Sequence, residues 1–96
     1  MVVGYGVIIL RVAECHSLKE KRKVVKSIIG RMRSNFNASV AETGANDIHQ
    51  RAEIGFSMVG NDVSLINSKM DQAINLVEDM GLAEIIDIDS EIMTVS

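Results

Sequence analysis

The residues of this chain with the clearest chemical potential are lysines and arginines between positions 19 and 33. Seven of the ten basic residues lie in this segment. Cations spaced three or four positions apart share one face of a helix, where they can neutralise successive phosphates of a nucleic acid. We expect this face to bind RNA or a ribonucleoprotein, without DNA sequence specificity. The residues expected to make the contacts are Lys19, Arg22, Lys23, Lys26 and Arg33.

The charge of the chain is divided between two opposed regions. Residues 1–33 carry eight basic and two acidic side chains, whereas residues 52–96 carry one basic and nine acidic. Because salt screens charges over roughly 8 Å, a partner responds to the local patch more than to the net charge of −3. The basic face is also compatible with a merely solvated helix surface. A third reading is an acidic protein partner, such as the acidic half of a second copy.

Other reactive side chains are too few or too scattered to predict a catalytic or metal centre. Cys15 and His16 are adjacent, but two ligands fall short of the four that a structural zinc site takes. Asp47, His49 and Arg51 place an acid, a base and a cation together, with no nucleophile beside them in sequence. We therefore expect no catalytic residues, no metal and no cofactor, and interpret the chain as a non-enzymatic binding domain.

Length and composition indicate one small globular domain over residues 1–96. Apolar residues make up 47% of the chain, which is enough for one modest core. The longest apolar run, Val7 to Leu10, is far shorter than a membrane span, so no membrane partner is expected. A single cysteine and the absence of a basic-then-apolar leader favour a cytoplasmic protein.

Hydrophobic periodicity predicts the elements that must position the basic residues. Ser17 and Glu20 form a capping box that starts a helix, and Asn61 or Asp62 caps a second helix that ends at Gly81. Alternating and β-branched residues predict the strands. The four predicted strands are Val2–Val12, Ala38–Thr43, Arg51–Val59 and Ile85–Val95.

The element order predicts a ferredoxin-like βαββαβ sandwich, with a four-stranded antiparallel sheet and two helices on one face. The helix side of the sheet should receive Ile8, Leu10, Val12, Ala38, Val40, Ile54, Phe56, Met58, Ile86 and Ile88. The open side should expose apolar residues that a second copy can cover, giving a homodimer. As the alternative to RNA binding, the chain would be a homo-oligomeric protein-interaction module that pairs through this face and has no nucleic-acid role. The expected interface residues are Tyr5, Val7, Ile9 and Arg11. If Glu42 is buried, Arg51 is its expected partner.

Several segments together resemble a known family. They are Ser17-Leu-Lys-Glu-Lys-Arg22, Phe36-Asn-Ala-Ser-Val-Ala-Glu42, Gln50-Arg-Ala52 with Gly55, and Asn61-Asp62. The sequence resembles the YlxP-like proteins, small bacterial proteins of unknown function, over nearly its whole length. This resemblance implies a ferredoxin-like fold and genomic company with translation and ribosome-maturation factors, and hence a role linked to RNA or the ribosome. It implies no catalytic residues.

Overall fold

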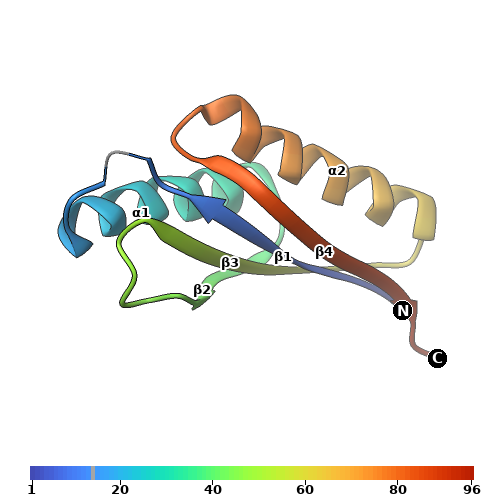
Figure 1. The fold of residues 1–96 in the computed structure, drawn as a ribbon. Coiled ribbons are helices and arrows are strands. Elements are labelled where there is room, and N and C mark those ends of the chain that lie inside the picture. Colours follow the sequence, from blue (N-terminus) through green and yellow to red (C-terminus); the bar gives the residue numbers. More distant parts are fainter. Residues whose placement is uncertain (14) are drawn as a thin grey trace.

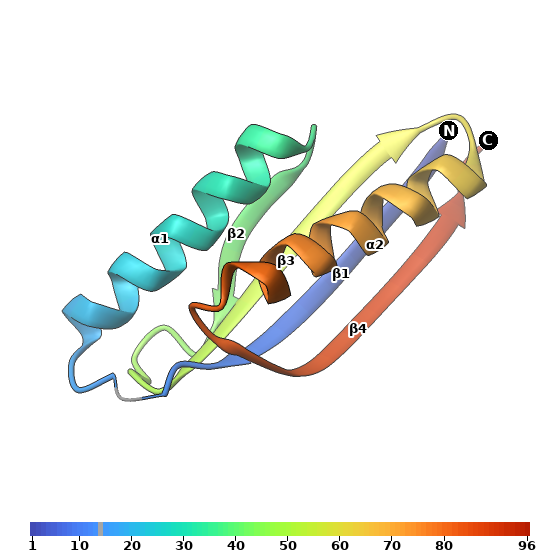
Figure 2. The same cartoon turned by 90° about the horizontal axis from the view of Figure 1, so that it is seen from above.

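The computed structural model describes residues 1–13 and 15–96, and its elements follow the predicted order (Figure 1). The elements are β1 (Val2–Arg11), α1 (Leu18–Asn35), β2 (Ser39–Gly44), β3 (Arg51–Gly60), α2 (Val63–Met80) and β4 (Glu84–Thr94). The strands form one antiparallel sheet in the order β2-β3-β1-β4. Both helices cover the same side of this sheet, which confirms the ferredoxin-like fold (Figure 2).

The helix boundaries follow from local hydrogen bonds that the sequence predicts. Ser17 Oγ accepts the N–H of Glu20 at 3.2 Å, and Glu20 Oε2 accepts the N–H of His16 at 2.9 Å. Asp62, rather than Asn61, caps α2 by accepting the N–H of Leu65 at 3.1 Å. Gly81 ends α2 with φ 65°, a left-handed conformation that glycine adopts without steric cost.

The core lies between the helix layer and the two central strands, β1 and β3. Alternate residues of these strands are buried, while each helix contributes a stripe spaced three or four residues apart. Gly4 lets α2 approach β1 closely, since a Cβ there would collide with Met70 and lie 2.6 Å from Ile66 Cγ2. Neither α1 nor α2 is apolar enough along its length to cross a membrane.

Two of the predicted core residues, Ile86 and Ile88, are exposed instead, at 47% and 39%. The β1–β4 register shifts at Ile9/Leu10, so Leu10 pairs with Ile85 and Ile86 becomes an extra residue. Ile88 is correctly placed opposite Ile8, but β4 is an edge strand, so its side chain is covered on one flank only. Ala38 precedes β2 and packs against the core, half-buried.

Candidate nucleic-acid interface

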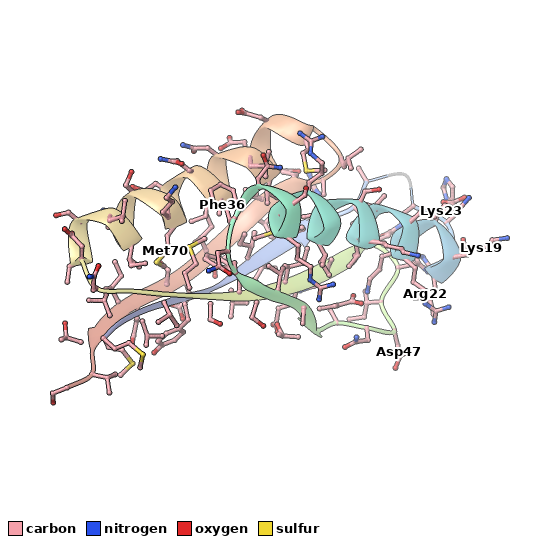
Figure 3. All side chains as sticks on the ribbon, turned by 180° about the vertical axis from the view of Figure 1, so that it is seen from behind. Lys19, Arg22, Lys23, Phe36, Asp47 and Met70 are labelled. Carbon is pink, nitrogen blue, oxygen red and sulfur yellow. The ribbon has the colours of Figure 1, made fainter. Side chains whose placement is uncertain are left out.

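The outer surface of α1 presents a cluster of exposed cations. Lys19, Arg22, Lys23 and Lys26 are all exposed on α1. Arg22 and Lys23 follow Lys19 by three and four positions, and Lys26 follows them by four and three, so the four side chains share one face of the helix. Figure 3 shows Lys19, Arg22 and Lys23 pointing away from the body of the protein at the N-terminal end of α1. The four positions span roughly 11 Å along the helix axis. We call these four residues the basic patch.

Arg33, the fifth residue predicted for this surface, has a structural partner. Its Nη2 donates a hydrogen bond to the carbonyl oxygen of Val40 at 2.6 Å. Val40 belongs to β2, whose outer edge has no neighbouring strand. The guanidinium therefore ties the C-terminal half of α1 to the sheet edge, and the basic patch is confined to the N-terminal half of the helix.

Lys21 lies within the basic segment but is buried, with 1% of its surface exposed. Its Nζ lies 3.0 Å from Glu42 Oε2 and also donates a hydrogen bond to the carbonyl oxygen of Ala45. The expected Glu42–Arg51 pair is therefore wrong: β3 places Arg51 opposite Arg11, on the face away from α1. Helical spacing already put Lys21 on the stripe of Val25 and Ile28, which was the available signal for its burial.

The remaining candidate chemical groups do not converge. Cys15 is buried, and its Sγ contacts the carbonyl oxygen of Ser17 at 3.3 Å, whereas His16 is exposed. Asp47 and His49 lie exposed in the β2–β3 loop. Within residues 1–13 and 15–96, no three histidine, cysteine, aspartate or glutamate side chains are grouped as metal ligands would be.

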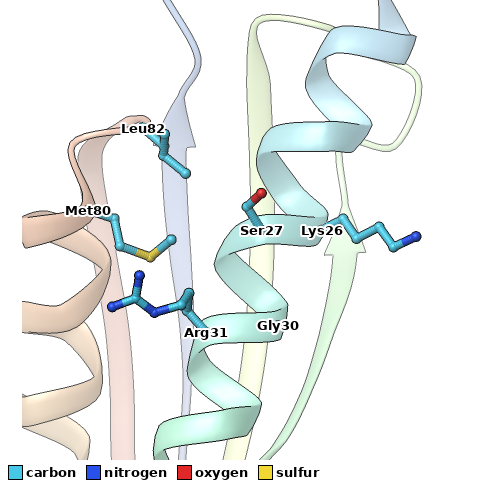
Figure 4. Close-up of a pocket in the computed structure, with 6 residues that line it drawn as sticks. All are labelled: Lys26, Ser27, Gly30, Arg31, Met80 and Leu82. Atoms are coloured by element: carbon cyan, nitrogen blue, oxygen red, sulfur yellow. The ribbon is translucent and has the colours of Figure 1, made fainter.

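A groove of about 500 Å³ separates α1 from the C-terminal end of α2 (Figure 4). Arg31 extends across it toward Met80, whereas Lys26 points the opposite way. Gly30 keeps its rim open, because no atom lies within 4 Å of the position a Cβ would take. The groove is lined by Lys26, Ser27, Gly30, Arg31, Met80 and Leu82. Arg31 is thus an exposed cation on a different flank of α1 from the basic patch.

The face of the sheet away from the helices is open, and the predicted interface residues lie on it. Val7 and Ile9 are half-buried there, and Tyr5 is 39% exposed. Arg11 forms an ion pair of 2.5 Å with Glu84 of its own chain, an exposed contact. Tyr5 Oη donates to Glu91 Oε2 at 2.7 Å, and this hydrogen bond together with the carboxylate charge raises the pKa of Tyr5 above its ordinary value of 10.0.

The open face is predominantly acidic, in contrast to the outer surface of α1. Register places five carboxylates and two guanidinium groups on it. The acidic residues are Glu53, Glu84, Asp87, Asp89 and Glu91, and the basic ones are Arg11 and Arg51. The acidic strand residues therefore lie on the surface opposite the basic helix, whereas the other acidic residues of region 52–96 lie on α2 or at its N-cap.

These features define a small α+β domain of the ferredoxin-like class with a basic helix and an acidic sheet face. The chain belongs to the family described as "Protein of unknown function (DUF503)", whose profile matches residues 3–90. It is 35% identical over 60 residues to "Uncharacterized protein YlxP" of Bacillus subtilis (strain 168), which confirms the YlxP-like resemblance. The alignment spans 62% of this chain and 65% of YlxP, slightly under two thirds of the latter.

Similar solved structures carry information about fold alone. The de novo designed protein Foldit4 matches over 100% of both chains with a TM-score of 0.56 and 11% identity. A second designed protein, LFR1 1, described as having a ferredoxin fold, has a TM-score of 0.55 and 15% identity, covering 99% of this chain and 87% of its own. Designed proteins reproduce the architecture, so function must be argued from surface residues.

Proposed function

We propose that the protein is a non-enzymatic RNA-binding domain, associated with RNA or a ribonucleoprotein through the basic patch on α1. The observation that carries this proposal is the availability of these four cations. Among the described residues, the ion pairs are Arg11–Glu84 and Lys21–Glu42. No described carboxylate therefore neutralises Lys19, Arg22, Lys23 or Lys26, and all four can contact phosphates.

The distribution of charge supports one direction of approach. The acidic open face repels a polyanion, whereas α1 lies on the other side of the sheet (Figure 1). The scarcity of exposed aromatic rings supports a particular mode of binding. Phe56 is buried, Phe36 is half-buried, and Tyr5 lies on the acidic face beside Glu91. Base stacking on the sheet is therefore disfavoured, and we propose recognition by backbone charge and shape.

The test is a fluorescence titration of the protein against a structured ribosomal RNA fragment. Changing Lys19, Lys23 and Lys26 together to glutamate should abolish binding while leaving the thermal unfolding midpoint nearly unchanged, since all three side chains are exposed. For the parent, the logarithm of affinity should fall with the logarithm of salt concentration with a slope between about −3 and −4 if four phosphates are contacted.

A matched control separates the basic patch from total charge. Changing Arg31, Arg51 and Lys69 to glutamate alters the net charge by the same amount at exposed positions elsewhere. This control should bind RNA far better than the patch variant. Equal loss in both variants would remove the basic patch as the specific site, and no binding by the parent would refute the RNA proposal.

A homodimer formed through the open sheet face is a second candidate. The observation in its favour is an apolar strip on the uncovered face of the sheet. The strip consists of Val3, Tyr5, Val7, Ile9, Val59 and Met93. Burial of such a strip against a second copy would stabilise a symmetric pair. Arg11 is already paired with Glu84, so apolar contact would have to supply most of the attraction.

A further inference from the structure

β4 forms one edge of the sheet, and part of its backbone faces outward. Met1 and Val95 exchange two hydrogen bonds, Met1 N to Val95 O at 2.8 Å and Val95 N to Met1 O at 2.7 Å. Bonded pairs alternate along an antiparallel ladder, and the register is continuous from here to Ile9↔Asp87. The residues that direct their N–H and C=O groups outward are therefore Ile88, Ser90, Ile92 and Thr94.

One observation supports this assignment directly. The N–H of Ile88 is bonded to the Oδ1 atom of Asp87 at 2.9 Å, so it does not bond to β1. A flexible carboxylate thus satisfies one outward amide of the edge, and an incoming strand can displace it. Within residues 1–13 and 15–96, no acceptor is hydrogen-bonded to the outward amides of Ser90, Ile92 and Thr94.

The opposite edge, β2, is protected in a way that β4 is not. β2 has only 6 residues, and Arg33 occupies the carbonyl of Val40, while Lys21 occupies that of Ala45 just beyond the strand. β4 has 11 residues and contains neither proline nor lysine. Neither α1 nor α2 covers its outer edge (Figure 2). A long edge with outward N–H and C=O groups is a template for an added strand, and acidic side chains such as those of β4 deter every strand that is not cationic.

The side chains of β4 specify what kind of strand fits. Ile88 and Ile92 lie on the helix side of the sheet, whereas Asp87, Asp89 and Glu91 lie on the open side. Side chains of an added antiparallel strand would alternate between the helix side and the open side of the sheet. Those on the open side would lie opposite Asp87, Asp89 and Glu91 in non-hydrogen-bonded pairs, in which side chains are closest. The complementary strand therefore alternates cationic with apolar residues.

We propose that the β4 edge binds an extended cationic segment of another protein, about eight residues long, by strand addition opposite Asp87–Thr94. A second copy of β4 does not fit, because antiparallel self-pairing would bring two acidic rows together. The site is separate from the basic patch on α1, and it does not depend on RNA binding.

The first probe is a labelled eight-residue peptide that alternates lysine with valine, compared with a peptide of four lysines followed by four valines. Both carry the same charge, but only the alternating peptide presents one cationic and one apolar face. The alternating peptide should bind at least tenfold more tightly to the full chain. Equal affinities, or no binding by either, would overturn the proposal and leave the acidic row as protection against edge pairing.

A second comparison tests the backbone contacts. In the bound peptide the valine amides face β4 and the lysine amides face away, so N-methylation of the valines should abolish binding, whereas N-methylation of the lysines should preserve it. Amide exchange at Ser90, Ile92 and Thr94 should slow at least tenfold when the peptide binds, with α1 unchanged. Equal effects of the two methylation patterns would exclude strand addition.

A third comparison tests the charge of the edge. Neutralising Asp87, Asp89 and Glu91 with asparagine and glutamine should weaken the alternating peptide at least tenfold. The matched control neutralises Asp71, Glu78 and Asp79 of α2, which changes the total charge equally. Equal weakening by both triple variants would show that net charge, and not the acidic row, attracts the peptide.

Discussion

Lys21 and Glu42 show how a single ion pair, separate from the basic patch, joins α1 to β2. The ammonium lies 3.0 Å from Glu42 Oε2, an atom that is buried and makes no hydrogen bond to a described residue. Removing either partner leaves the other charge uncompensated in the interior. The same ammonium binds the carbonyl of Ala45, so the pair also fixes the β2–β3 loop against α1.

We expect Lys21→Met to lower the free energy of unfolding by about 3 kcal/mol, because it strands the Glu42 carboxylate. The double variant with Glu42→Met should recover most of this loss, since no buried charge remains. Urea unfolding of the two single variants and the double variant measures the coupling. Additive effects would show that the two side chains do not stabilise each other.

Tyr5 offers a second test at the residue scale, because it is the single tyrosine of a chain without tryptophan. Its hydrogen bond to Glu91 and the adjacent charge disfavour the phenolate and raise its pKa above 10.0. An ultraviolet titration of the parent should therefore have a higher midpoint than one of Glu91→Gln. A group with a raised folded-state pKa stabilises the fold below its unfolded pKa, so this contribution is lost as pH rises through the folded pKa. Equal midpoints would contradict the role of Glu91.

The sequence predicted which residue types form the basic patch but not which of them are available. Charge and spacing identified the helix, and all five predicted cations are exposed on it, but only the four of the basic patch have no hydrogen-bond or ion-pair partner among the described residues. Arg33 was assigned to the same surface because its spacing matched, but its partner is a backbone carbonyl on a strand. A sequence pattern cannot reveal that bond, since it depends on where β2 lies relative to α1.

At the scale of elements, the caps and periodicities of both helices were predictable because they depend on neighbouring residues. The course of β4 was less so. Its alternation of isoleucine and acid indicated a strand with two faces, yet a register shift displaced Ile86 and the edge position exposed Ile88. The register depends on pairing with β1, and the exposure of Ile88 depends on how far α2 extends over the edge strand. Neither can be read from the sequence of β4 alone.

The glycines of α1 and β1 provide a matched pair of tests for how closely elements pack. Gly30 lies within α1 and faces open space, so Gly30→Ala should raise the free energy of unfolding by about 0.5–1 kcal/mol. Gly4→Ala should lower it by about 1–3 kcal/mol, because the new methyl group meets Ile66 and Met70 of α2. Urea unfolding measures both. A stabilising Gly4→Ala would show that α2 does not depend on this close approach.

At the scale of the whole molecule, the fold separates the charges that the sequence holds in different segments. The βαββαβ order places the basic helix on one layer and the acidic strand residues on the other. If the basic patch and the acidic strand residues bind as proposed, two surfaces of opposite sign on one small domain can engage different partners without competing. Salt should therefore act differently on each association of this protein, according to which surface it uses.

Dimerisation through the open face provides the decisive whole-molecule test of the second candidate. Five carboxylates of each copy would approach those of the other, so screening should favour the dimer and its affinity should rise with salt. RNA binding should weaken under the same change. Sedimentation velocity across protein concentration at low and high salt measures the first effect, and the titrations of the basic patch measure the second.

The variant that tests the interface changes Val7 and Ile9 together to lysine, which places two charges at the centre of the apolar strip. It should be a folded monomer at every concentration, since both side chains point away from the core. Arg11→Gln is the control, because Arg11 pairs within its own chain and its loss should leave dimerisation nearly unchanged. A parent that stays monomeric at high concentration and high salt would refute pairing through this face. The apolar strip, which is separate from the β4 edge and from the basic patch, would then be available to a different protein.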